Sequence, residues 1–197
     1  MTLDAAALDL IFRNARSINV WLPKPVTDDQ VKAIYEVMKW GPTSANSSPA
    51  RILFLRTPAA KERVRPALSA QNAEKTMSAP VVAIIGNDSR FYENLPQLFA
   101  HNQTARSWFE GDDKKEVAAV TAMRNATLQG AYFIIAARAL GLDCGPMSGF
   151  DNGIVDKTFF ADGRIKSNFI CNIGYADRAK IMPRNPRLTF DEACQLL

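Results

Sequence analysis

Apolar residues recur along this chain with two different periods, which predict where helices and strands lie. Helical spacing appears in 3–12 and again in 31–38, where Thr27 is placed to cap the helix and Gly41 to end it. The second helix is expected to bury one face, made of Val31, Ile34, Tyr35, Val37 and Met38. The longest helical pattern, 115–140, is apolar on nearly every side and predicts a central core helix. Its apolar pattern is marked by Val117, Val120, Ala131, Ile134, Ile135 and Ala139.

Short continuous apolar runs predict three buried strands, at 51–56, 81–85 and 168–175. A helix expected at 57–70 has a threonine cap and a proline in its first turn, and a helix at 151–160 begins with a capping aspartate. Strands and helices do not alternate strictly. The pattern therefore predicts a single α+β domain over residues 1–197 rather than a doubly wound parallel sheet.

The segment 89–113 breaks both patterns, because its aromatic residues are scattered among Asn, Gln, Gly and Asp. It is interpreted as a lid or an insertion. Its aromatic side chains can cover a ligand, or they can form a small cluster that packs the loop down on the domain.

Composition excludes several classes of protein. The 197 residues are 47% apolar, enough for a real core, and the net charge of +4 comes without any basic block, which disfavours nucleic acid as a partner. No apolar run approaches the roughly 20 residues of a membrane span, so a soluble, cytoplasmic protein is expected, with no membrane partner.

Cysteine and histidine usage narrows the chemistry further. Cys144, Cys171 and Cys194 all lie in apolar contexts and form no CxxC pair, so ordinary buried thiols in a reducing compartment are expected. His101 is the only histidine, which argues against a zinc site or a histidine-based triad, and no metal is predicted. The sequence contains neither GxGxxG after a strand nor GxxxxGK[ST].

One polar stretch, 39–56, links a helix end to a buried strand. Pro42 and Pro49 bracket a turn that carries four hydroxyl side chains and the amide of Asn46. Such a turn can hold a flat polar ligand, or its side chains can simply satisfy their own backbone.

Four separated segments resemble motifs that occur together in one known protein family. They are Arg16-Ser17-Ile18-Asn19, the turn from Pro42 to Pro49, Asn72-Ala73-Glu74-Lys75, and Pro146-Met147-Ser148-Gly149-Phe150, with Arg184 and Arg187 in the tail. Together they resemble the FMN-dependent nitroreductase family over essentially the whole chain. The resemblance implies an antiparallel-containing sheet flanked by helices, FMN as cofactor, NADPH or NADH as hydride donor, and a homodimer with sites at the subunit interface.

The resemblance also implies roles for individual residues. Near the flavin phosphate and ring edge it places Arg16, Ser17, Asn19, Arg184 and Arg187, and at the ring from the neighbouring subunit it places Pro42, Thr43, Ser44 and Asn46. Asn72 and Lys75 would lie near N1 and O2, with Lys75 stabilising the reduced flavin. The segment Pro146, Met147, Ser148 and Gly149 would lie at N5 and O4, with the backbone N–H groups of Ser148 and Gly149 meeting them.

Some features leave these roles open. Asn19 stands where Arg or Lys is common in the family, and Ser48 stands in place of a usual glutamine. Lys75 can also be a solvated lysine after a helix, Ser148 and Gly149 a plain helix entry, and the two tail arginines a basic surface.

Further motifs, including ARSWF at 105–109, GLDCGPMSGFD and KSNFICNIGY, resemble the branch containing malonic semialdehyde reductase. That branch implies ping-pong hydride transfer through flavin N5, reducing malonic semialdehyde to 3-hydroxypropionate. Arg106, Trp108 and Phe109 are candidates to bind the small aldehyde acid. The alternatives are a broad nitroaromatic or quinone reductase and a flavin-binding protein without turnover.

Overall fold

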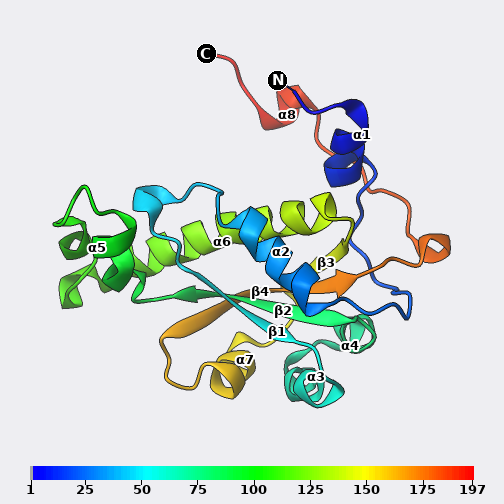
Figure 1. Cartoon of the computed structure of the whole chain (residues 1–197), viewed down its shortest axis with the longest axis horizontal. Helices are drawn as coiled ribbons and strands as arrows, with labels where there is room; N and C mark the ends of the chain where they lie inside the picture. The colour runs from blue at the N-terminus through cyan, green and yellow to red at the C-terminus, as the bar shows by residue number, and fades with distance from the viewer. Residues whose placement is uncertain (1) are drawn as a thin grey trace.

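The computed structural model describes residues 2–197, and its centre is a four-stranded sheet (Figure 1). The strands lie in the order β1 (Ala50–Leu55), β2 (Val81–Asp88), β4 (Ile165–Gly174) and β3 (Asp143–Met147). Each neighbouring pair is antiparallel. The α+β class and the three expected strands are therefore confirmed.

The fourth strand, β3, was not predicted. Its residues DCGPM contain a glycine and a proline, which are uncommon inside strands. Pro146 is tolerated there because β3 is an edge strand, paired only with β4 among the named strands.

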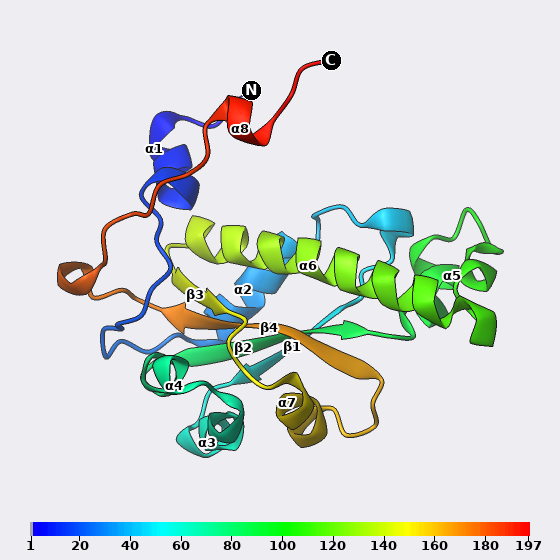
Figure 2. The same cartoon turned by 180° about the vertical axis from the view of Figure 1, so that it is seen from behind.

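Helices cover both faces of the sheet (Figures 1 and 2). On one face lie α2 (Asp28–Met38) and α6 (Lys115–Ala139), and on the other α3 (Pro58–Val64), α4 (Ala70–Met77) and α7 (Asn152–Phe159). Along β2, Val81, Ala83 and Ile85 face the first layer, whereas Val82 and Ile84 face the second. The strand is therefore buried on both sides, which explains its unbroken apolar run.

The remaining elements are short. They are α1 (Ala5–Leu8), α5 (Leu95–Leu98), α8 (Phe190–Ala193), a π-helical turn at Asp9–Arg13, and 3₁₀ turns at Ser44–Asn46, Arg65–Ala67, Phe91–Asn94, Ala105–Trp108, Asp112–Lys114 and Arg178–Lys180.

Local sequence sets most helix starts. Thr27 and Gln30 form a reciprocal capping box at α2, and the Asp151 side chain accepts from the Ile154 N–H at α7. The helix predicted over 57–70 is wrong in its second half. Pro66 lies in the 3₁₀ turn that follows α3, because proline lacks the N–H that would continue the α-helical ladder, and α4 then begins separately.

The length of α6 and its place in the core are confirmed, but not every apolar residue of its pattern is buried. Val117 and Val120 are 46% and 47% exposed, and the buried side is made mainly of small residues such as Ala118, Ala122 and Ala126. A helix that is apolar all round gives no sequence signal for which side faces the core. Small residues occupy that side because the helix lies close to the sheet: a Cβ at Gly130 would be 2.4 Å from the Phe169 ring.

The same correction applies to α2. Val31, Ile34 and Met38 are buried as expected, whereas Tyr35 and Val37 are about half exposed.

The segment 89–113 folds into short turns and α5 at one end of the molecule, against the first half of α6 (Figure 1). Phe91 and Leu95 form a small apolar cluster with Ala118 and Ala122, and Phe109 packs on Phe91 with ring centroids 5.0 Å apart. The packing alternative is thus correct for Phe109. Trp108 stays 45% exposed at the rim of this cluster.

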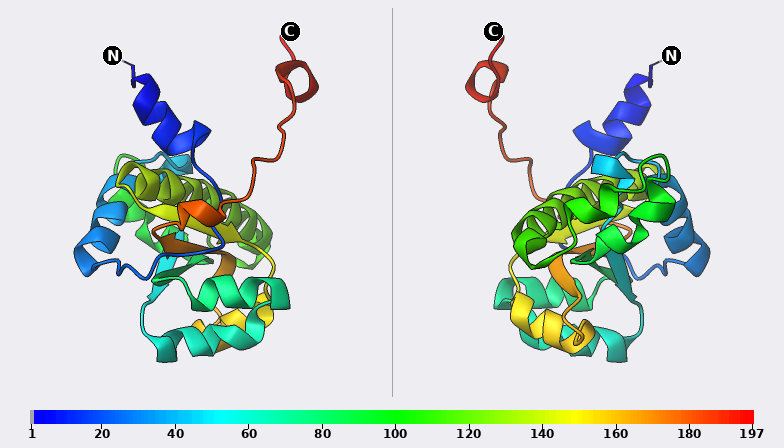
Figure 3. Two further views of the ribbon diagram at one scale, coloured as in Figure 1. Left: turned by 90° about the vertical axis from the view of Figure 1, so that its right-hand side faces the viewer. Right: turned by 90° about the vertical axis from the view of Figure 1, so that its left-hand side faces the viewer.

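The prediction that the cysteines are buried thiols is confirmed only in part. Cys144 and Cys171 are buried free thiols, but Cys194 is exposed, so the prediction of three buried thiols is wrong for the last. Cys194 lies in an arm, 182–197, whose residues are all exposed and which extends away from the sheet (Figure 3).

Within residues 2–197, no helix is long and apolar enough to cross a membrane.

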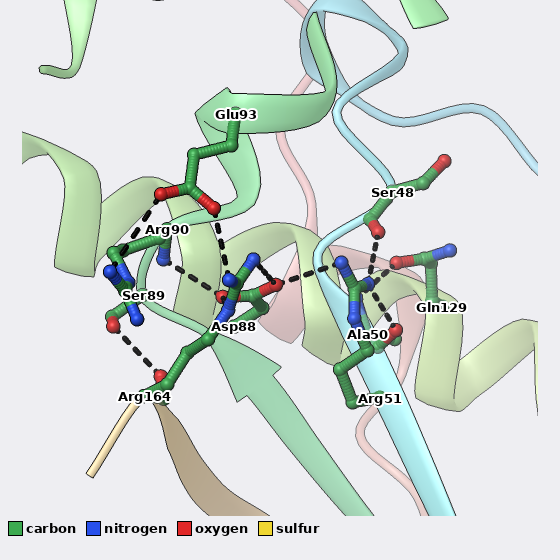
Figure 4. Close-up of polar contacts among 9 residues, drawn as sticks. All are labelled: Ser48, Ala50, Arg51, Asp88, Ser89, Arg90, Glu93, Gln129 and Arg164. Carbon is green, nitrogen blue, oxygen red and sulfur yellow. Dashed lines mark hydrogen bonds and ion pairs between the residues drawn. The ribbon is translucent and has the colours of Figure 1, made fainter. Parts of the chain in front are cut away.

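A buried carboxylate at the end of β2 joins several elements (Figure 4). Asp88 is 1% exposed and accepts from Arg51 Nη2 at 2.8 Å and from Arg164 Nε and Nη2 at 2.8 and 2.9 Å. Its Oδ1 also accepts from the Arg90 backbone N–H at 2.9 Å. Burial alone would raise the pKa of the Asp88 carboxyl. The hydrogen bonds from Arg164 and Arg90, with the two guanidinium charges, outweigh burial and lower that pKa.

Asp88→Asn is expected to lower the free energy of unfolding by about 3 kcal/mol near pH 7, because it leaves two guanidinium groups without their buried counter-charge. Since the native pKa of Asp88 is lowered, its contribution is present above the unfolded-state value of about 3.9 and is lost as the pH falls through the native value. Urea unfolding at a series of pH values measures both effects. The wild-type advantage should shrink as the pH falls below about 4.

Glu93→Gln is the matched control. Glu93 is partly exposed and pairs with Arg164 at 2.9 Å, so its loss should cost less than about 1 kcal/mol. Equal losses in the two variants would contradict the role given to burial at Asp88.

Candidate functional site

Four arginines line one cavity of about 870 Å³ between the N-terminal segment and the tail. They are Arg16, Arg138, Arg184 and Arg187, and Ser17 and Asn19 lie in the same wall. The residues lining this cavity include no Asp or Glu, and none of the four arginines forms an ion pair within residues 2–197. The cavity is thus a concentration of uncompensated positive charge, suited to an anion.

Backbone contacts with β3 position the N-terminal wall. Ser17 forms a parallel bridge with Cys144, and the Ile18 N–H donates to the Cys144 carbonyl at 3.0 Å. A Cβ at Gly145 would lie 2.4 Å from the Ile18 carbonyl oxygen, so only glycine allows this approach.

The tail is tied to the same place by Arg184. Its Nη2 donates to the carbonyls of Phe12, Arg13 and Ala15, which lie at the end of the first helical segment. Burial, followed by the charges of Arg16, Arg187 and Arg138, lowers the pKa of the Arg184 guanidinium. The lowered pKa of Arg184 thus reflects desolvation first and, second, repulsion by the neighbouring positive charges, which a bound anion would relieve.

A second cavity, of about 580 Å³, is lined by Asn19, Asn72 and Lys75. Asn19 belongs to both cavities, so the two adjoin at this residue. Two of the four sequence segments therefore meet here, and the cationic cavity opens beside them.

Lys75 lies within α4, so the picture of a solvated lysine after a helix is wrong in its placement. Its carbonyl accepts from Trp21 Nε1 at 2.9 Å and from Asn172 Nδ2 at 3.3 Å, which fixes the backbone. The ammonium has no hydrogen-bond acceptor or ion-pair partner among the described residues, and burial lowers the pKa of Lys75. This arrangement leaves the charge available to a ligand in the second cavity.

The glycine segment after β3 joins the same wall. Asn72 Nδ2 donates to the Gly149 carbonyl at 2.8 Å, and a Cβ at Gly149 would lie 2.6 Å from that nitrogen. The N–H groups of Ser148 and Gly149 donate to no described residue. Met147, in contrast, turns its side chain into the core, where its sulfur accepts from the Thr76 hydroxyl at 3.5 Å.

The turn 42–49 lies elsewhere, beside the segment 89–113 and the first half of α6 (Figure 1). Side chains of α6 hold it: the Asn125 amide oxygen accepts from the Ser44 N–H, and the Gln129 amide oxygen accepts from the Ala50 N–H, both at 2.8 Å. The Tyr132 hydroxyl donates to the Pro42 carbonyl at 2.9 Å.

Backbone strain accompanies this rigidity. Ala45, Asn46 and Ser48 have φ values of 51°, 49° and 41°, in the left-handed region that non-glycine residues rarely adopt. Asn46 Nδ2 donates to the Leu98 carbonyl at 2.8 Å, which joins the turn to the segment 89–113.

The substrate candidates share this end of the molecule. Arg106 pairs with Glu110, four residues on, through Nε at 2.9 Å and through Nη2. Arg106 and Trp108 are exposed, and Phe109 packs inward.

The predicted residues thus divide into two groups at opposite ends of the sheet (Figures 1 and 2). Near α1, α4 and β3 lie Arg16, Ser17, Asn19, Asn72, Lys75, Pro146, Met147, Ser148, Gly149, Arg184 and Arg187. Near α5 lie Pro42, Thr43, Ser44, Asn46, Arg106, Trp108 and Phe109. One chain does not bring the two groups together.

The comparison with protein families fits this geometry. A model described as the nitroreductase family matches residues 12–175. The chain belongs to the nitroreductase family. A protein of Cupriavidus pinatubonensis is 60% identical over 189 residues, 96% of each chain, and another from Ralstonia nicotianae is 55% identical over 196 residues, 100% of this chain and 99% of its own. Both are provisionally named NADH dehydrogenase/NAD(P)H nitroreductase.

Solved structures extend the match to the fold. A protein of Bacillus subtilis, provisionally named a nitroreductase, has a TM-score of 0.88 at 21% identity, covering 98% of this chain and 100% of its own. A protein of Exiguobacterium sibiricum, given the same provisional name and solved in complex with FMN, has a TM-score of 0.84 at 16% identity, covering 100% and 99%. The nitroreductase-like fold is therefore confirmed.

Several residues of this nitroreductase-family site escaped the sequence prediction. Arg138 lies in the last turn of α6, where an arginine is normally assigned to the helix dipole. Asn125 and Gln129 are polar residues four apart in an apolar helix, and this spacing on one face was a usable signal that they bond something outside it.

Asn125→Leu is expected to loosen the turn, because the Ser44 N–H loses its acceptor. Amide hydrogen exchange measured by NMR should become about tenfold faster at Ser44, which corresponds to about 1.4 kcal/mol. Asn168→Leu is the control, since Asn168 bonds only the Thr127 hydroxyl on the other side of α6. Unchanged exchange at Ser44 would show that Asn125 does not hold the turn.

Proposed function

We propose that this protein is an FMN-dependent NAD(P)H oxidoreductase that reduces malonic semialdehyde to 3-hydroxypropionate. The observation that carries the proposal is the pair of adjoining cavities: an arginine-lined space meets, at Asn19, a second space that holds an unpaired lysine. The family, the named relatives and the FMN-bound neighbour of the same fold support it.

The residues present fit FMN. A phosphate carries two negative charges, and the first cavity offers cations without any carboxylate. The second cavity offers Lys75 to the electron-rich edge of the ring. The segment with the unused N–H groups of Ser148 and Gly149 is bonded to Asn72, which lines that cavity. Arg16, Arg184 and Arg187 would hold the phosphate, with Ser17 and Asn19 between phosphate and ring.

FMN, when bound, supplies a ring that accepts a hydride from NAD(P)H and passes it to a second substrate. Lys75 contributes a fixed positive charge in a partly desolvated position, where it acts more strongly on nearby negative charge than in water. Asn72 orients the Gly149 carbonyl and so sets the direction of the neighbouring N–H groups. These groups are held in place before the ligand arrives, so little reorganisation is needed.

A second copy of the chain would complete the site. Within one chain, the turn 42–49 and the region of α5 lie at the opposite end of the sheet from α4, the helix that carries Lys75 (Figures 1 and 2). The turn and the exposed Arg106 and Trp108 would therefore act on the site of the partner in a homodimer. Surfaces are available for such contact: α6 exposes Val117 and Val120, and the arm 182–197 extends away from its own sheet.

Arg106 favours the aldehyde acid as substrate. Its guanidinium would release Glu110 and bind the substrate carboxylate through charge-assisted hydrogen bonds. A broad nitroaromatic or quinone reductase is the second candidate. It is favoured by the exposed ring of Trp108, on which a flat substrate can stack, and by the names of the relatives.

An anaerobic titration tests the proposal. The purified protein should be a yellow dimer that bleaches with NADPH or NADH and recovers its colour with malonic semialdehyde. A colourless protein that does not bind added FMN would refute the flavin assignment. Bleaching followed by recovery with a nitroaromatic alone would favour the second candidate, and colour without bleaching would favour a non-catalytic flavin-binding protein.

Lys75→Met should slow flavin bleaching by NADPH roughly a hundredfold while FMN stays bound, because the charge that stabilises the reduced state is lost. Stopped-flow absorbance measures the rate. Lys157→Met, on the exposed last turn of α7, is the matched control and should match wild type. If both variants bleach at the wild-type rate, Lys75 has no such role.

Arg106→Ala should raise KM for malonic semialdehyde about tenfold and leave KM for a neutral quinone nearly unchanged. Steady-state kinetics with the two substrates provide the comparison. Lys114→Ala, directly after the same segment, controls for a general loss of positive charge. Parallel increases for both substrates would rule out carboxylate binding by Arg106.

A further inference from the structure

Arg138 is the one arginine of the cationic cavity that none of the sequence motifs includes. It lies in the last turn of α6, so it comes from a different layer of the fold than Arg16 and the tail arginines. Its Nη1 donates to the Ile11 carbonyl at 3.1 Å, which aims the guanidinium at the N-terminal wall of the cavity.

The rest of this guanidinium group is unused by the protein. Its Nε is buried without a hydrogen-bond partner, and Nη2 donates to no described residue. A buried donor without an acceptor normally costs about 1–3 kcal/mol, so a native structure that keeps one usually has a partner for that group at another stage of its function.

The charge of Arg138 is also uncompensated. Within residues 2–197 it has no carboxylate partner, whereas the neighbouring Arg178 pairs with Asp143 at 2.8 Å. Arg138 and Arg178 line one further cavity together, with Asp9 and Asp143 in its wall. Even there, Asp143 pairs with Arg178, whereas Arg138, which also lines the cationic cavity, forms no ion pair among the described residues.

We infer that Arg138 is a fourth phosphate-binding arginine, which holds the phosphate monoester of the cofactor from the helical layer while Arg16, Arg184 and Arg187 hold it from the N-terminal segment and the tail. This inference rests on the proposed function. Its consequence is specific: Arg138 recognises the phosphate and contributes nothing to binding the flavin ring.

A purely structural role makes a different prediction. Through its bond to the Ile11 carbonyl, Arg138 could serve only to anchor the first helical segment to α6. In that case its loss would disturb the wall that carries Arg16 and Asn19, and binding of any flavin would weaken to a similar degree.

The decisive experiment compares FMN with riboflavin, which has the same ring and no phosphate. Dissociation constants are measured by flavin fluorescence on the flavin-free full-length protein, for wild type, Arg138→Met, Arg138→Gln and the control Arg65→Met. Arg65 pairs with Glu62 on the far side of the sheet, so its variant removes one positive charge without touching the cavity. Urea unfolding confirms that each variant is folded, and Arg138→Gln keeps a donor for the Ile11 carbonyl.

Arg138→Met and Arg138→Gln should each weaken FMN binding about tenfold to a hundredfold and change riboflavin binding less than about twofold. The FMN affinity of wild type should also fall more steeply with added salt than that of either variant. Arg65→Met should bind both ligands as wild type does.

Unchanged FMN affinity in both Arg138 variants would overturn the inference and leave the proposed function intact. Equal weakening of FMN and riboflavin would overturn it in favour of the anchoring role. A wild-type protein that binds neither flavin would refute the proposed function and this inference together.

Discussion

The buried carboxylate of Asp88 is the constraint on which one end of the molecule depends. It joins Arg51 of β1 to Arg164 at the start of β4, and the segment 89–113 leaves the sheet directly after it (Figure 4). Arg51 also donates to the carbonyl of Ser48, the last residue of the turn with a positive φ, at 3.1 Å, so the strained turn is tied to the same charge. Asp88 belongs to neither the turn nor the segment 89–113, yet its carboxylate fixes their positions relative to each other.

The chain has two clusters of arginines, and only one of them is paired with carboxylates. Arg51 and Arg164 face a carboxylate that accepts four hydrogen bonds, and Glu93 meets the outer side of Arg164. In the cationic cavity no carboxylate is present, and the arginines bond backbone carbonyls, which carry no net charge. Paired arginines stabilise a fold, whereas unpaired arginines gathered around a cavity destabilise it unless something negative binds. The second cluster is therefore better explained by ligand binding than by folding.

The sequence predicted those features whose signal is local. Caps at Thr27 and Asp151, the apolar runs of β1, β2 and β4, and the length of α6 all depend on neighbouring residues. It failed where the decision is made by tertiary packing. The face of α6 that is buried depends on how closely the helix approaches the sheet, and β3 forms although it contains glycine and proline because β4 offers it an edge.

In the candidate site, too, residues within local motifs were predicted and residues that act through long-range contacts were not. The family motifs located the residues near Lys75, and the structure places those segments together. Arg138, Trp21 and Asn125 lay outside the motifs, since each acts through a contact more than 50 residues away in sequence. Of the three, only Asn125, four residues before Gln129 in an apolar helix, had a local signal, and that signal does not say which residue it bonds.

The strained turn links these observations to assembly. Three non-glycine residues with positive φ cost of order 1 kcal/mol or more each. Two buried amides of α6 bond the backbone on either side of them, at Ser44 and Ala50. Yet the turn faces no cavity that contains the arginines or Lys75 of its own chain. Such strain persists where the surroundings over-determine a conformation needed for binding. In the proposed homodimer, the site of a second copy of the chain would give that conformation a ligand to bind, and the exposed valines of α6 would gain a surface that covers them.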